Sequence, residues 1–233
     1  MKINIYSIIL YCIIFFNSYL TSAQVIVKCA GKKYIIPAFK QNTVNASGGD
    51  FENFGILSPI LQSQYDIELR GFYKTSNPFI GSAVVIKGNK EKLIAEAYFF
   101  KIQGGLTKTT LASDFKVINK GNLLVFYNVK SVRPADTLLN SLIKNKLFTL
   151  PDVKNLTDSL LKNNIKLLKS GEMDPYHMQF ELKVKNQYRS FGCDPSLYYT
   201  NPNVKELLPE KLLFDQFDQL YKASGQERNH LFP

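Results

Sequence analysis

Few side chains in this sequence have the type and spacing that catalysis or metal binding requires. The chain contains two histidines: His230 lies in the polar tail 225–233, and His177 follows Glu172 and Asp174. Carboxylate and imidazole groups at such spacing could bind a divalent ion. A polar loop that leads into a strand explains the same residues equally well. We therefore expect no metal site and no bound cofactor.

Glu96 lies among apolar neighbours in the segment 93–102. A carboxyl group on a buried strand could have a raised pKa and act as an acid or base; pairing with a lysine is the alternative. No nucleophile elbow or phosphate-binding loop accompanies it. The expected function is therefore non-enzymatic, a binding or interaction module. The alternative is a cell-envelope hydrolase that uses carboxylates on a glycan substrate.

Cys29 and Cys193 are the two cysteines outside the N-terminal apolar segment. Each is predicted at the end of a strand, and an oxidising compartment would permit a disulfide between them. In the chain-entropy model a loop of roughly 165 residues would stabilise the fold by at most about 5 kcal/mol. Two free buried thiols are the alternative, because sequence does not show whether the two sites meet.

A helix is predicted to begin near Thr149, which is its candidate cap, and to end at Gly171. One face of this helix is predicted to carry a stripe of lysines. Lys162, Lys166 and Lys169 recur there at helical spacing. Such a stripe could contact anionic headgroups. An ordinary solvated helix face produces the same pattern, so the stripe is a candidate surface only.

Aromatic residues and an arginine gather in the sequence around Cys193: Tyr188, Arg189, Tyr198 and Tyr199. Aromatic side chains with arginine can stack on sugars or form the centre of a protein interface. Packing over the predicted disulfide is the alternative interpretation of this group.

The first 23 residues have the order of a secretory signal peptide. Lys2 is the only charge before an apolar run from Ile5 to Phe16, and Thr21-Ser22-Ala23 ends the segment. The run is shorter than the roughly 20 residues that a membrane-spanning helix needs. We predict cleavage near Ala23 and a single exported domain over residues 24–233, in the periplasm, at the cell surface or secreted. An uncleaved N-terminal anchor is the alternative.

The charge of the chain is strongly positive, with 29 Lys and Arg residues against 19 Asp and Glu and a net charge of +10. A basic surface favours anionic partners. Export makes nucleic acid the least expected of these, so an anionic component of the cell envelope or another envelope protein is the expected partner. The alternative is that the lysines serve only solubility.

The apolar periodicity predicts how these residues are positioned. Short turns join alternating segments at 25–36, 82–102 and 115–129 into hairpins of antiparallel strands. The strand 65–73 is expected to turn Glu68 and Arg70 to solvent. After Pro134 helical spacing dominates, broken by one long strand over 180–191, and the last helix runs from Pro209 to Gly225. We predict an α+β domain, an antiparallel meander sheet with about three helices on one face.

The second half of the chain resembles an uncharacterised family of secreted proteins from gut and soil bacteria. The shared order is a helix, LPD, a lysine-rich helix, the strand FELKVKNQYRSF, DP, NP and a final amphipathic helix. The strand YDIELRGFY in the first half is similar as well, so the resemblance covers more than half of the chain. It implies one exported α+β domain and brings no activity and no functional residue. The chain departs from the family in containing no Trp.

Overall fold

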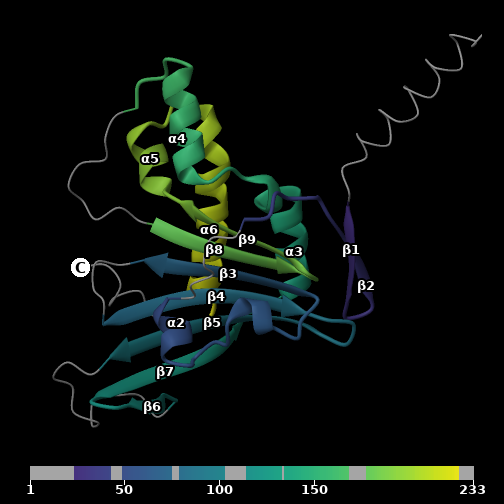
Figure 1. The fold of residues 1–233 in the computed structure, drawn as a ribbon, viewed down its shortest axis with the longest axis vertical. Helices are drawn as coiled ribbons and strands as arrows, with labels where there is room; N and C mark the ends of the chain where they lie inside the picture. Colours follow the sequence, from purple (N-terminus) through teal and green to yellow (C-terminus); the bar gives the residue numbers. More distant parts are fainter. Residues whose placement is uncertain are drawn as a thin grey trace, which may run out of the picture.

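The computed structural model describes residues 24–42, 49–74, 79–102, 114–132, 134–167 and 177–225. The predicted signal peptide lies outside these residues. The described chain forms a seven-stranded antiparallel sheet, a separate two-stranded sheet and several helices (Figure 1). The predicted α+β class is therefore confirmed.

The large sheet is built from strands of both halves of the chain. The strands are β1 (Val25–Cys29), β2 (Lys32–Ile36), β3 (Ile67–Lys74), β4 (Ile80–Gly88), β5 (Leu93–Ile102), β6 (Lys116–Lys120), β7 (Leu123–Val132), β8 (His177–Val184) and β9 (Gln187–Cys193). Strands β1 and β2 pair only with each other, and the large sheet has the order β6-β7-β5-β4-β3-β8-β9. It is not a simple meander, because β7 lies between β5 and β6 and β8 returns to pair with β3.

The predicted hairpins are confirmed, whereas one predicted strand is not. The three hairpins are present as β1–β2, β4–β5 and β6–β7. The predicted long strand over 180–191 is wrong, since it is the hairpin of β8 and β9. Its turn includes Lys185, whose φ of 53° is left-handed, a conformation that ends a strand.

The helices are α2 (Asp50–Asn53), α3 (Ala135–Lys144), α4 (Val153–Lys162), α5 (Pro195–Thr200) and α6 (Leu208–Ala223). Helix α6 starts with Pro209 in its first turn and ends before Gly225, as predicted. Helix α4 is capped by Asp152, whose carboxylate accepts a hydrogen bond from the Lys154 N–H at 3.0 Å. Among the described residues no helix is long and apolar enough to span a membrane.

Both faces of the large sheet are covered. On one face, α3, α6 and the β1–β2 hairpin bury the larger apolar core, in which Phe217 of α6 packs edge-on against Phe180 at 4.9 Å. On the other face lies α2 (Figure 1). Its Phe51 packs against Phe72 and Phe100. The predicted helices α3 and α6 thus share one face, while α2, a short helix that the sequence analysis did not predict, covers the other.

The predicted disulfide is wrong, because Cys29 and Cys193 are free and buried. Cys29 packs against Gly88, which pairs with Ile67 at the start of β3. Cys193 is aligned through β8 with Tyr73, near the end of β3. The strand from Ile67 to Tyr73 is about 20 Å long at about 3.4 Å per residue. This separation exceeds the roughly 7 Å between Cα atoms that a disulfide can bridge.

Candidate functional site

A buried charged cluster lies between β3, β8 and the segment that contains α2. Arg70 is 2% exposed, and its Nε donates to Glu68 at 2.8 Å. Its Nη1 donates to Glu52 of α2 at 2.9 Å, and its Nη2 donates to the Ser58 carbonyl oxygen at 2.7 Å. Glu181 of β8 lies 3.6 Å from Nη1. The expectation that Glu68 and Arg70 face solvent is therefore wrong.

Three carboxylates share one guanidinium in this cluster, and their charges are not fully balanced. Burial raises the pKa of Glu181 to about 7; the Arg70 charge opposes this rise, and Glu52 and Glu68 add to it. Neither carboxyl oxygen of Glu181 has a hydrogen-bond partner in the described part of the chain. Near pH 7 a fraction of Glu181 is consequently protonated, which reduces the negative charge beneath α2.

An open cleft of about 520 Å³ lies beside the charged cluster, and we call it the Tyr65 cleft. It is formed by the segment after α2 and by strands β3, β4 and β5. Its lining residues are Ile56, Leu57, Ser58, Gln62, Ser63, Gln64, Tyr65, Glu68, Arg70, Lys87, Asn89, Glu91, Lys92 and Tyr98. Hydroxyl, amide and ammonium groups dominate this lining, so the cleft suits a polar ligand.

Two lysines approach the Tyr65 ring at the cleft. The ammonium groups of Lys87 and Lys92 each lie 5.6 Å from the ring centroid. Lys87 also pairs with Glu96 at 2.8 Å, and the Tyr98 hydroxyl donates to the same carboxylate at 2.7 Å. Lys92 is exposed at the rim. Lys92 is therefore the cation best placed to meet a ligand.

Glu96 does not have the raised pKa that sequence suggested. Burial pushes the pKa of this carboxyl group upward, but hydrogen bonds from Lys87 and Tyr98 and the nearby lysine charges outweigh burial and lower it. Glu96 is therefore ionised and paired near pH 7. This matches the alternative interpretation, in which the carboxylate pairs with a lysine.

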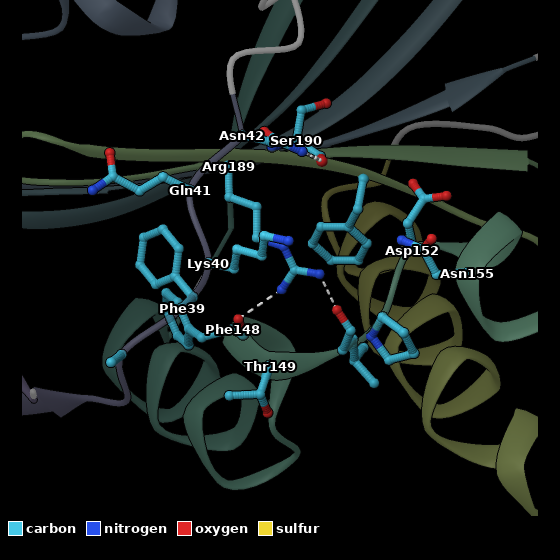
Figure 2. Close-up of a pocket in the computed structure, with 14 residues that line it drawn as sticks. Phe39, Lys40, Gln41, Asn42, Phe148, Thr149, Asp152, Asn155, Arg189 and Ser190 are labelled. Atoms are coloured by element: carbon cyan, nitrogen blue, oxygen red, sulfur yellow. Dashed lines mark hydrogen bonds between the residues drawn. The ribbon is translucent and has the colours of Figure 1, made fainter. Parts of the chain in front are cut away.

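A second cleft, of about 400 Å³, lies at the edge strand β9 (Figure 2). Arg189 crosses it and donates to the carbonyl oxygens of Phe148, at 2.7 Å, and Leu150. The Asn42 side chain bonds both backbone groups of Ser190, accepting from its N–H at 2.9 Å and donating to its carbonyl oxygen at 2.5 Å. These polar groups hold the sheet edge to the neighbouring segments, which indicates a structural role.

Asp152 completes the same structural arrangement. One carboxylate oxygen caps α4, and the other accepts the Gly192 N–H at 3.0 Å. Both backbone groups of Ser190 and the Gly192 N–H on β9 are thus bonded by side chains of the chain itself. An exposed sheet edge invites pairing with other chains, and these bonds reduce that risk.

The candidate basic surface does not form as predicted. Helix α4 ends at Lys162, and Asn164 then takes a left-handed φ of 59°. Lys166 therefore lies beyond the helix, and Lys169 lies outside the described residues. The predicted stripe of three lysines on one helix face is wrong, because α4 stops before the pattern repeats.

The candidate aromatic surface is divided between two places. Tyr188 is buried beside Ser190 on the face of the sheet that carries Glu181, while Arg189 lies in the β9 cleft. Tyr198 and Tyr199 lie together on α5 with ring centroids 6.2 Å apart. The four side chains cannot form one surface, since neighbouring residues of a strand point to opposite faces.

No metal site is found in the described part of the chain, which contains no group of three or more His, Cys, Asp or Glu residues that could hold an ion. Glu172 and Asp174 lie outside the described residues, and only the backbone of His177 is described.

Comparisons with protein-family models, with curated proteins and with solved structures give no match to this chain. The arrangement of its own side chains is therefore what bears on function. The resemblance to secreted bacterial proteins stays an expectation.

The sequence analysis did not predict that Glu68 and Arg70 are buried or that the Tyr65 cleft exists, although the sequence contains a sign that this face of the sheet is covered. Strands β4 and β5 carry apolar residues on both faces, such as Val84 on one face and Val85 on the other. Strands that are apolar on both faces are buried on both faces. The side of β3 that carries Arg70 also carries Phe72, so its polar residues belong to a covered face.

Proposed function

We propose that this protein is an exported binding module whose Tyr65 cleft holds an anionic glycan of the cell envelope. The observation that carries the proposal is the approach of two lysine ammonium groups to the Tyr65 ring within an open polar cleft. An aromatic ring offers an apolar surface to the face of a sugar, and lysines pair with its carboxylate or phosphate groups.

The buried charged cluster supports binding by making the floor of the cleft rigid. Arg70 is fixed by Glu68, by Glu52 and by the Ser58 carbonyl oxygen, so the segment that forms one wall is tied to β3. Side chains held by their own hydrogen bonds lose little freedom when a ligand binds. The wall and the floor are therefore organised before the ligand arrives.

The carboxylates near the cleft favour binding over hydrolysis. Glu68 accepts from Arg70 through one oxygen and from the Ser63 hydroxyl through the other. Glu181 has the raised pKa of an acid catalyst, but it is 1% exposed and does not line the cleft. Glycoside hydrolysis needs two carboxyl groups that flank the substrate bond. A carboxylate-dependent hydrolase is accordingly the less supported function.

Export supports an envelope ligand. The apolar run from Ile5 to Phe16 followed by Thr21-Ser22-Ala23 favours a cleaved signal peptide. A mature chain that begins at Gln24 would meet acidic glycans and phosphate-bearing polymers outside the cytoplasm. N-terminal sequencing of the protein recovered after export should start at Gln24, and an intact N-terminus would contradict cleavage.

The binding proposal can be tested by titration calorimetry with an oligomer of galacturonic acid, with a neutral glucose oligomer of the same length as reference. We expect the acidic oligomer to bind at least about tenfold more tightly, since a charge-assisted hydrogen bond is worth roughly 1.5–3 kcal/mol. Lys92→Gln and Tyr65→Leu should each weaken binding of the acidic oligomer by a similar factor.

Lys120→Gln on the edge strand β6 is the matched control, because it removes one exposed lysine far from the cleft. It should change affinity less than about twofold, as expected for a screened distant charge. Equal binding of the two oligomers, or equal weakening by Lys92→Gln and Lys120→Gln, would contradict the proposal. Release of new reducing ends from the acidic oligomer would favour the hydrolase alternative instead.

A further inference from the structure

The outer face of the β1–β2 hairpin combines exposed apolar and basic side chains. Strand register places Ile26 directly opposite Ile35 and Lys28 directly opposite Lys33. The alternate residues, such as Tyr34, point inward to the core. Ile26 and Ile35 are 44% and 48% exposed, and both lysines are exposed. We call this outer surface the ribbon face, defined by Ile26, Lys28, Lys33 and Ile35.

Folding alone does not explain the ribbon face. Like charges directly opposite each other on a sheet are unfavourable, and two β-branched apolar side chains remain in water beside them. Lys32 pairs with Asp136, whereas none of the ion pairs among the described residues includes Lys28 or Lys33. A partner that is anionic and partly apolar would relieve both costs.

We infer that the ribbon face docks on an anionic phospholipid bilayer. Surfaces that bind in the plane of a membrane insert apolar side chains at the boundary of the headgroups and place lysines among the phosphates. The surrounding sequence has the complementary charge, because residues 24–49 contain Lys28, Lys32, Lys33 and Lys40 and no Asp or Glu.

The position of the hairpin fits this occupant. Figure 1 shows β1 and β2 at the periphery of the fold, beside the end of the large sheet. In this position the ribbon face is left exposed by the rest of the described chain, so a flat surface such as a bilayer can reach it.

Docking through the ribbon face would also bring the Tyr65 cleft close to the membrane. The Ala30 N–H in the hairpin turn donates to the Asn89 carbonyl oxygen at 3.2 Å, and Asn89 lines the cleft. The ribbon face and the cleft are separate surfaces that share this rim. The inference therefore stands or falls independently of the glycan proposal.

Co-sedimentation with vesicles tests the inference, using the chain from Gln24, which contains every described element. We expect binding to vesicles of equal parts phosphatidylglycerol and phosphatidylcholine, little binding to phosphatidylcholine alone, and weaker binding as salt rises. Lys28→Gln with Lys33→Gln should lower the partition coefficient at least about tenfold. Ile26→Thr with Ile35→Thr should lower it as well, while retaining β-branched residues in both strands.

Lys116→Gln with Lys120→Gln on β6 is the matched control, because it removes the same charge from exposed positions of another strand. Its partition coefficient should change less than about twofold. Lys28→Arg with Lys33→Arg should retain binding, which separates loss of charge from loss of fold. The inference is overturned by absent binding to anionic vesicles, by equal losses in the β6 control, or by a dimer in light scattering that Ile26→Thr with Ile35→Thr abolishes.

Discussion

At the scale of single residues, the charges with the largest expected effect on stability are buried. Arg70 links β3, α2 and the Ser58 carbonyl oxygen, and three carboxylates depend on it. A buried ion pair adds little stability compared with an apolar replacement of the whole pair, but removal of one partner leaves an uncompensated charge. The protein should therefore be far more sensitive at Arg70 than at its exposed lysines.

Arg70→Met should destabilise the protein by about 3–5 kcal/mol at pH 7, because three carboxylates lose the guanidinium that pairs with them. Urea unfolding followed by circular dichroism measures this free energy of unfolding. The loss should be smaller at pH 5, where protonation removes part of the unpaired charge. Lys92→Met, an exposed control, should cost less than about 0.5 kcal/mol. Similar stability of the two variants would show that the cluster is unimportant.

Glu210 in α6 gives a second prediction, because burial raises its pKa to about 8. A carboxyl group whose pKa is raised by folding stabilises the folded state most below its unfolded pKa of 4.5. That contribution is lost as pH rises from about 4.5 to about 8. Glu210→Gln should therefore raise the melting temperature at pH 8 and leave it nearly unchanged at pH 4.5, as thermal melts across this range would reveal.

Glu206→Gln is the matched control for this pH dependence, since Glu206 is exposed one turn earlier. Its melting temperature should follow that of the unmodified protein at every pH. If Glu210→Gln stabilises no more at pH 8 than at pH 4.5, the carboxyl group is not protonated in the folded protein.

At the scale of elements, α6 is positioned by close contact with β3, an interior strand of the large sheet. A Cβ atom built on Gly71 would lie 2.6 Å from the Phe217 ring and 2.8 Å from the end of Met178. The absence of a side chain at Gly71 thus lets Phe217 approach the sheet and contact Phe180. This packing also fixes the helix that carries Glu210.

Gly71→Ala should destabilise the protein by about 1–3 kcal/mol, because the added methyl group overpacks the contact with Phe217. Combining it with Phe217→Leu should cost less than the sum of the two single variants, since the smaller side chain makes room for the methyl group. A double-mutant cycle from urea unfolding measures this coupling. If the two changes in unfolding free energy simply add, Gly71 and Phe217 are not energetically coupled.

At the scale of the whole molecule, strands from both halves of the sequence share one sheet. Strand β3 pairs with β4 on one side and with β8 on the other, so neither half buries its apolar residues alone. Cys29 packs against one end of this sheet at Gly88, Cys193 lies towards the other end, and both are buried. They can therefore report separately on how the ends unfold.

Cys29→Ser and Cys193→Ser each leave one of these two thiols in the chain from Gln24. Reaction with Ellman's reagent at increasing urea should expose both thiols at the same midpoint, as expected for one cooperative domain. Denatured, unreduced protein without substitutions should show two reactive thiols. Distinct midpoints would indicate two folding units, and absence of reactive thiols would indicate a disulfide.

The sequence by itself determined the features that depend on neighbouring residues. The hairpin turns, the span of α6 from Pro209 towards Gly225 and the α+β class follow from apolar periodicity and turn chemistry. Only the tertiary structure decided that Arg70 is buried and that Cys29 is about 20 Å from Cys193 along the strand direction. Strand pairing across long sequence distances leaves no local pattern. The apolar residues on both faces of β4 and β5 indicate that both faces are covered, but they do not show which segments cover them or which side chains meet there.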